Sequence, residues 1–129
     1  MPTSSPLILC IDDEVCGLSI RKIVLERSGF RVLTAPDGPS GLELFHQHPI
    51  DLVVLDYAMP GMNGGEVAER MRAAIPEVPI LLLSAYLDLP PSVAKSVDST
   101  IMKGNNPEVL IEKLIELLPP VKRRLRKAP

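Results

Sequence analysis

The stretch DLVVLDYAMPGMNGGEV, residues 51–67, contains the feature that decides the fold. Its four consecutive apolar residues, 52–55, predict a strand buried on both faces, and Asp56 follows at the end of that strand. Proline, glycine and asparagine then predict a loop. A carboxylate in apolar surroundings is unfavourable when it is alone, so Asp56 requires a partner or a function.

Short apolar runs alternate with helical spacing along the rest of the chain. The apolar runs predict five strands, at residues 7–11, 32–35, 52–55, 80–83 and 99–102. Apolar residues three and four apart predict five helices, the fourth of them short, at residues 15–28, 40–47, 64–74, 91–97 and 107–118. Strands alternating with helices predict an α/β domain with a parallel sheet.

The fourteen prolines mark the boundaries of these elements, because none of them interrupts a predicted helix or strand. Pro36 and Pro39 are expected between the second strand and the second helix. Pro107 follows Asn106 as a first helical residue follows its N-cap.

The composition fits one domain, since 46% of the 129 residues are hydrophobic. No apolar run approaches the roughly 20 residues of a membrane helix, and the N-terminus lacks a basic region with a cleavage site. We therefore expect a cytoplasmic protein that does not enter the membrane. Cys10 and Cys16 are expected to be reduced thiols rather than a disulfide or a metal site.

The charge is unevenly distributed. Five of the fourteen basic residues lie among the last eight, namely Lys122, Arg123, Arg124, Arg126 and Lys127. Residues 1–121 thus carry 9 basic and 16 acidic side chains, a net charge of −7. This acidic body argues against nucleic-acid binding by the domain. We interpret residues 119–129 as a solvated basic tail, with contact to nucleic acid or an anionic surface as the alternative.

Polar residues follow four of the five predicted strands. They are Asp12 and Asp13, Asp56, Ser84, and Lys103. Because the carboxyl ends of parallel strands meet at one edge of the sheet, and ligands bind there, we expect these side chains to converge.

Taken singly, each of these residues has a simpler interpretation. Asp12 or Asp13 would serve as an N-cap of the next helix, Ser84 as a loop hydroxyl and Lys103 as a solvated side chain. Taken together, clustered carboxylates must take up protons or bind a cation, and oxygen ligands suit Mg²⁺. A carboxylate nucleophile beside Mg²⁺ and a lysine is suited to forming an aspartyl-phosphate.

Four motifs at the strand ends match one known family. They are LCIDDE (9–14), DLVVLDYAMPGMNG (51–64), ILLLSA (80–85) and IMKG (101–104). Over residues 6–118 the chain resembles the receiver domain of two-component response regulators. The resemblance implies a flavodoxin-like, doubly wound, five-stranded parallel sheet of order 2-1-3-4-5 with five flanking helices.

The resemblance also implies the roles of the site residues. Asp56 would be the phosphoacceptor that attacks the phosphohistidine of a histidine kinase or phosphotransfer protein. Asp56, Asp13 and the backbone carbonyl of Ala58 would bind Mg²⁺ directly, and Asp12 would act mainly through water. Lys103 would contact a phosphoryl oxygen.

The switch residues implied by the resemblance include one departure from the family. Ser84 would turn its hydroxyl towards the phosphoryl group. Thr100 lies where the family has a rotating aromatic residue, so the usual coupling between hydroxyl and ring cannot operate in its usual form.

Two further departures concern the region around the fifth strand. Gly104 follows Lys103 where the family has proline. The segment 84–103 is shorter than usual and contains two prolines, which predicts a short or displaced fourth helix. That helix belongs, with the fifth strand and fifth helix, to the face that receivers use for output, so a downstream effector protein and a homodimer are the partners expected there.

Two side chains near the acceptor suggest slow hydrolysis of the acyl phosphate. Ala58 has no polar group to orient a water molecule, and Tyr86 is placed to screen the phosphoryl group. We therefore expect a long-lived phosphorylated form.

The leading interpretation is a stand-alone signalling switch that is not an enzyme beyond catalysing its own phosphorylation and dephosphorylation. A receiver used as a phosphorylation-independent interaction domain is the first alternative. An aspartyl-phosphate phosphohydrolase is the second, although such enzymes place the nucleophile after the first strand with a second Asp two residues on, where this chain has Glu14. The chain could also be a piece of a larger regulator, although Met1 suggests a native start.

Overall fold

The computed structural model describes residues 5–86 and 88–119, which form one five-stranded parallel sheet covered by helices. The strands have the spatial order β2-β1-β3-β4-β5. Their bounds are β1 (Leu7–Ile11), β2 (Arg31–Ala35), β3 (Leu52–Asp56), β4 (Ile80–Ser84) and β5 (Ser99–Met102). The predicted fold class is confirmed. The chain adds β2 on one side of β1 and then β3, β4 and β5 on the other, and this reversal of the strand order defines the doubly wound topology.

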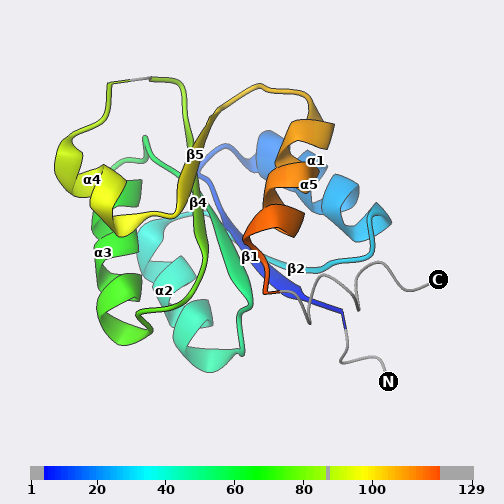
Figure 1. The fold of residues 1–129 in the computed structure, drawn as a ribbon, viewed down its shortest axis with the longest axis horizontal. Coiled ribbons are helices and arrows are strands. Elements are labelled where there is room, and N and C mark those ends of the chain that lie inside the picture. Colours follow the sequence, from blue (N-terminus) through cyan, green and yellow to red (C-terminus); the bar gives the residue numbers. More distant parts are fainter. Residues whose placement is uncertain (1–4, 87, 120–129) are drawn as a thin grey trace.

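Helices cover both faces of the sheet (Figure 1). One face carries α2 (Gly38–Gln47), α3 (Gly64–Ala74) and α4 (Pro91–Ser96). The other face carries α1 (Val15–Arg27) and α5 (Pro107–Leu117). The chain therefore forms three layers, with the carboxyl ends of all five strands at the same edge.

The core is divided into two halves by the sheet, because successive side chains of a strand point to opposite faces. On the first face, Leu9 and Val53 pack in one cluster with Met71 of α3. On the second face, Cys10 and Val54 pack in another cluster with residues of α1 and α5. The three central strands are buried along their whole length, as their continuous apolar runs predict.

Helix α2 begins two residues earlier than expected. Pro39 was predicted to lie between elements, and this is wrong, because it occupies the first turn of α2. A first-turn proline costs no hydrogen bond, since the first N–H groups of a helix have no partner within it. Asp37 caps this end by accepting a hydrogen bond of 2.9 Å from the backbone N–H of Ser40.

Helix α1 buries a narrower stripe than its composition suggests. Leu18 and Leu25 are buried, whereas Ile20 and Ile23 are 61% and 50% exposed. Of these four apolar residues in the helix predicted at residues 15–28, only the two that lie seven positions apart face the sheet. Arg21 falls between the two buried leucines on this stripe.

Helix α4 has six residues, which confirms the prediction of a short fourth helix. Arg72 of α3 supports its carboxyl end, because the guanidinium donates to the carbonyl oxygen of Ser96 at 3.1 Å and to Oδ2 of Asp98 at 2.7 Å. The same Asp98 oxygen accepts from the backbone N–H of Ile80 at 2.7 Å. Through these bonds, α3 fixes the entry into β5.

Three further predictions concern the cysteines, membrane-spanning helices and the basic tail. In the described residues, Cys10 is buried and Cys16 is exposed, and both are free cysteines. No helix within 5–86 and 88–119 combines the length and the apolar character needed to cross a membrane. Of the basic tail, residues 120–129 lie outside the described part of the chain.

Gly64, the first residue of α3, packs closely against the backbone of Asp56 and Tyr57. A Cβ at Gly64 would lie 2.5 Å from the carbonyl oxygen of Asp56 and 2.8 Å from Cα of Tyr57. The backbone N–H of Gly64 donates to the carbonyl of Tyr57 at 2.8 Å. Any side chain at this position would push the loop away from the end of β3.

We predict that Gly64→Ala destabilises the protein by about 1–3 kcal/mol, because backbone atoms must move to admit the methyl group. Gly17→Ala is the matched control, since a Cβ at Gly17 in α1 meets nothing within 4 Å. It should stabilise by about 0.5–1 kcal/mol. Urea unfolding monitored by circular dichroism measures both, and equal stability of the two variants would contradict the close packing of Gly64.

Candidate functional site

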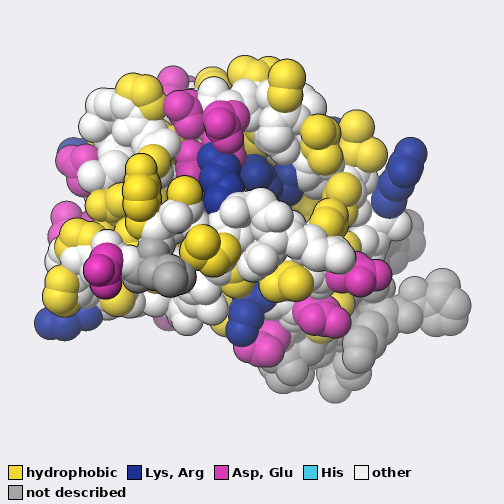
Figure 2. Space-filling view, turned by 90° about the horizontal axis from the view of Figure 1, so that it is seen from above, with side chains coloured by type: hydrophobic (Ala, Val, Ile, Leu, Met, Phe, Trp, Pro, Cys, Tyr) yellow, Lys and Arg dark blue, Asp and Glu magenta, His cyan; other side chains and the backbone are white. Residues whose placement is uncertain are grey.

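Three aspartates meet at the carboxyl edge of the sheet. Asp12 follows β1 and Asp56 ends β3, and these two strands are hydrogen-bonded neighbours. Asp12 is fully buried and Asp56 is 2% exposed, whereas Asp13 is exposed. One oxygen from each of the three lies within 4.8 Å of the others. Figure 2 looks onto this edge and shows acidic side chains beside basic ones near its middle.

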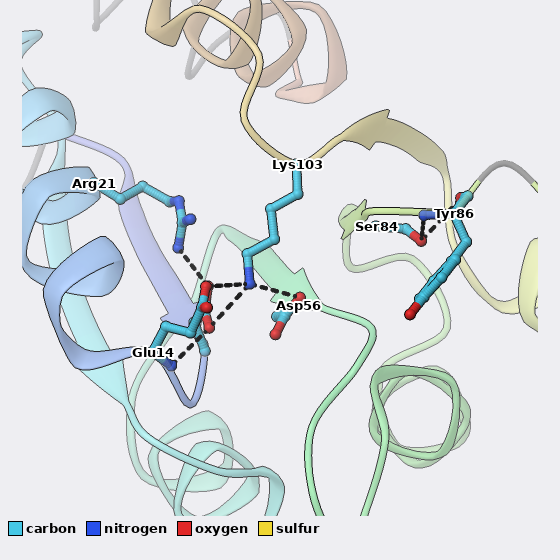
Figure 3. Close-up of polar contacts among 7 residues, drawn as sticks. Glu14, Arg21, Asp56, Ser84, Tyr86 and Lys103 are labelled. Atoms are coloured by element: carbon cyan, nitrogen blue, oxygen red, sulfur yellow. Dashed lines mark hydrogen bonds and ion pairs between the residues drawn. The ribbon is translucent and has the colours of Figure 1, made fainter.

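Lys103 lies between the carboxylates (Figure 3). Its Nζ is 3.2 Å from Oδ1 of Asp56, 3.2 Å from Oδ2 of Asp12 and 2.9 Å from Oε1 of Glu14. The backbone N–H of Lys103 donates to the carbonyl of Ser84 at 2.8 Å, which continues the pairing of β4 with β5. This pairing brings the lysine to the site although Gly104, with φ of +94°, replaces the family's proline.

Asp12 has partners on both of its oxygens. Oδ1 accepts from the backbone N–H of Glu14 at 2.9 Å, and Oδ2 is 3.2 Å from Nη1 of Arg21 as well as 3.2 Å from Lys103. The alternative interpretation of Asp12 as a helix cap is thus partly right, since it binds a backbone N–H at the start of α1. The N-cap residue of α1 itself is Glu14.

Asp56 is less well satisfied than Asp12. Its Oδ1 contacts Lys103, but Oδ2 has no hydrogen-bond partner among the described residues. A buried carboxylate oxygen without a partner is costly, so it marks a place where a ligand or a reaction partner belongs. Asp56 also lines a cavity of about 250 Å³, together with Asp13, Ala58 and Tyr86.

The two buried carboxylates differ in acidity. Burial and the neighbouring charge of Asp12 raise the pKa of Asp56 from 3.8 to about 6. Burial acts in the same direction on Asp12, but the Glu14 N–H, Lys103 and Arg21 outweigh it and hold the pKa of Asp12 below its usual value. Burial opposes the charge of Lys103, and the surrounding carboxylates outweigh it, so its pKa is raised.

The predicted switch hydroxyl is engaged in a turn. Oγ of Ser84 accepts from the backbone N–H of Tyr86 at 2.9 Å and donates to the Tyr86 carbonyl at 2.9 Å. The side chain of Tyr86 is 59% exposed beside the cavity. Thr100, at the position of the family's aromatic residue, is exposed on β5. The structure therefore brings Ser84 to the site edge, whereas Thr100 lies outside it.

The oxygen atoms at this edge fit a hard divalent cation. The unpaired Oδ2 of Asp56 and the exposed Asp13 are available as ligands, and all donors are oxygens, as Mg²⁺ prefers. Asp12 has both oxygens occupied, which is consistent with action through water. Burial, and after it the charge of Asp12, raises the pKa of Asp56, and a bound cation would offset both effects by stabilising the carboxylate.

Sequence reasoning missed two residues of this site. Arg21 has only 13% of its side chain exposed and pairs with Asp12, and Glu14 makes the shortest contact to Lys103. A signal for Arg21 existed in the sequence, since a charged residue lay three positions after Leu18 and four before Leu25 on an apolar stripe. No comparable signal identified Glu14 as the partner of a residue so distant in the chain.

Comparisons with known proteins agree with this geometry. The family model described as response regulator receiver domain matches residues 8–115. The transcriptional regulatory protein AfsQ1 of Streptomyces coelicolor is 40% identical over 64% of this chain and 36% of its own length. The probable transcriptional regulator ycf27 of Guillardia theta is 35% identical over 94% of this chain and 47% of its own length. The chain thus spans less than half of these relatives.

A solved structure extends the comparison to the fold. The crystal structure of response regulator protein TrrA from Thermotoga maritima, in complex with Mg²⁺–BeF, superposes with a TM-score of 0.81 at 35% identity. The superposition covers 88% of this chain and 99% of TrrA. The fold of this chain is therefore similar to that of a solved response regulator.

We predict that Asp56→Asn raises the free energy of unfolding by about 1–3 kcal/mol at pH 7 in metal-free buffer, since it removes a buried anion of raised pKa. The folded protein holds the Asp56 proton more tightly than the unfolded chain does. Wild-type stability is thus lost as pH rises from about 4 to about 6, and the advantage of the variant should grow over that window and then level off.

Asp88→Asn, at an exposed aspartate, is the control and should change stability by less than about 0.5 kcal/mol. Urea unfolding at several pH values measures the difference between each variant and wild type. A difference for Asp56→Asn that is independent of pH would contradict the assignment.

Proposed function

The chain belongs to the response regulator receiver domain family, and from this premise we propose that Asp56 accepts a phosphoryl group from the phosphohistidine of a histidine kinase or phosphotransfer protein. The observation that carries the proposal is the buried Oδ2 of Asp56, which has no partner among the described residues, on a side chain that lines the cavity at the sheet edge. An ionised, unpaired oxygen is what a nucleophile requires. With a pKa of about 6, Asp56 is mostly ionised at neutral pH.

The proposed step transfers the phosphoryl group in one displacement. Oδ2 of Asp56 attacks phosphorus, and the new O–P bond forms as the N–P bond of the phosphohistidine breaks. The imidazole leaves with the electron pair of that bond and takes up a proton from solvent. Lys103 already contacts Oδ1 of Asp56 at 3.2 Å, so its ammonium is positioned to offset charge on the transferred group.

The residues that would hold Mg²⁺ are Asp13, Asp56 and the backbone carbonyl of Ala58, with Asp12 acting through water. The metal supplies neutralisation of the phosphoryl charge when it is bound. Support comes from the all-oxygen donor set and from the relative TrrA, whose structure is a complex with Mg²⁺–BeF.

The proposed switch begins at Ser84. When its hydroxyl turns towards a phosphoryl group on Asp56, it must give up the two bonds to the backbone of Tyr86. The turn after β4 then loses its support, which changes the surface near α4. Because Thr100 cannot supply a rotating ring, we propose that this turn carries the signal to the partner.

The partners follow from this switch. We propose a stand-alone cytoplasmic receiver, without catalytic activity beyond its own phosphorylation and dephosphorylation, that binds a separate effector protein. The surface formed by α4, β5 and α5 is the proposed site for the effector or for a second copy. Relatives named as transcriptional regulators support an output in gene control.

Contacts at the edge favour Asp56 over Asp12 as the nucleophile. A phosphohydrolase of the aspartyl-phosphate type would use the carboxylate after β1, which is Asp12. Both oxygens of Asp12 are occupied by cations or by a backbone N–H, whereas Asp56 has an unpaired oxygen. This difference supports the receiver chemistry.

We predict that the protein incubated with Mg²⁺ and acetyl phosphate gains the mass of one phosphoryl group on Asp56. Asp56→Ala should abolish the gain, and Asp88→Asn should retain it. Intact-protein and peptide mass spectrometry measure the result. Absence of uptake by a protein that binds Mg²⁺ normally would reject the proposal and support a phosphorylation-independent interaction domain.

We also predict that the phosphorylated form is long-lived, because Ala58 offers no group to orient water and Tyr86 borders the cavity. Ala58→Asn and Tyr86→Ala should each shorten the half-life severalfold, the first by adding a polar amide and the second by admitting water. The decay of phosphorylated protein with Mg²⁺ and no phosphatase measures this. A wild-type half-life of only seconds would contradict the prediction.

A further inference from the structure

Arg21 approaches the site from helix α1. It lies on the buried stripe of α1, with only 13% of its side chain exposed, and its Nη1 is 3.2 Å from Oδ2 of Asp12. Figure 3 shows Arg21 pointing from α1 towards the carboxylates, while Lys103 reaches them from the end of β5. Two cations thus approach the same acidic cluster from different directions.

Acidic side chains outnumber basic ones around Asp12. The acidic cluster consists of Asp12, Asp13, Glu14 and Asp56, and the cations that contact it in the described structure are Arg21 and Lys103. With every group ionised, the cluster carries two negative charges with Arg21 present and three without it. A divalent cation is attracted by the larger charge, whereas an incoming phosphoryl group is repelled by it.

We propose that Arg21 is a positioning residue that sets the charge of the phosphoacceptor site, weakening divalent-cation binding and favouring phosphoryl entry by neutralising Asp12. The inference rests on the proposed function, because it concerns the cation and the phosphoryl group of that reaction. Arg21 acts through Asp12, since its described contact is to that side chain and not to Asp56 or Asp13.

A purely structural role for Arg21 makes the opposite prediction for cation affinity. If Arg21 only oriented Asp12, its removal would loosen the site and weaken metal binding. Without Arg21, however, Asp12 keeps the backbone N–H of Glu14 at 2.9 Å and Lys103 at 3.2 Å, so its orientation is still determined. The loss of a positive charge should therefore outweigh the loss of one contact.

Removal of Arg21 should change the stability of the protein and its Mg²⁺ affinity in opposite directions. Removing Arg21 leaves a buried carboxylate with one cation fewer, so Arg21→Gln should unfold more easily. The same variant should bind Mg²⁺ more tightly, by about 3- to 10-fold, because the site becomes more negative. A structural role would lower both stability and affinity.

The experiment measures the dissociation constant of Mg²⁺ by isothermal titration calorimetry for wild type and three variants. Arg21→Gln should bind more tightly, and Arg21→Lys should return to within about twofold of wild type because it keeps the charge. Lys22→Gln is the matched control, since Lys22 lies on the same helix but pairs with the exposed Glu26. It should leave the affinity unchanged within about twofold.

A second measurement addresses the phosphoryl group. At saturating Mg²⁺, Arg21→Gln should be phosphorylated by acetyl phosphate severalfold more slowly than wild type, and Arg21→Lys should recover the rate. Unchanged or weaker Mg²⁺ binding by Arg21→Gln, or equal effects of Arg21→Gln and Lys22→Gln, would overturn the inference while leaving the proposed function intact. A wild-type protein that binds no Mg²⁺ would overturn both.

Discussion

The structure depends on two carboxylates, Asp12 and Asp56, buried side by side at the ends of neighbouring central strands. Like charges in this position repel, so the fold must bring positive charge to them. Lys103 does so from the far side of β4, and its position depends on the pairing of β5 with β4. The strand order and the entry into β5 therefore determine where Lys103 lies, and Lys103 in turn lowers the pKa values of both aspartates.

The arrangement gives two similar residues different chemistry. Asp12 receives a backbone N–H and two cations, which keep its pKa low despite burial. Burial and the charge of Asp12 raise the pKa of Asp56, and Lys103 only partly offsets them. Pairs of carboxylates whose environments separate their pKa values take separate roles. Asp12 and Asp56 are thus distinguished by their partners rather than by their residue type.

The segment between β4 and β5 is held differently at its two ends. Arg72 fixes the end of α4 and the start of β5 through the Ser96 carbonyl and Asp98. The turn at Tyr86 depends instead on the hydroxyl of Ser84, at the end of the strand that pairs with β3. A movement of the Ser84 hydroxyl is therefore expected to act first on the turn, because the opposite end of α4 is held by charged hydrogen bonds.

The amino-acid sequence by itself determined the strands, most helix bounds and the residues at the sheet edge, because apolar period and proline position act locally. It predicted Asp12, Asp13, Asp56, Ser84 and Lys103 as one group, since parallel strands end at one edge. Only the tertiary structure decided that Arg21 pairs with Asp12, that Glu14 holds Lys103 and that Ser84 binds the Tyr86 backbone. Those contacts depend on helix orientation and side-chain rotamers, which long-range packing sets and local sequence patterns do not encode.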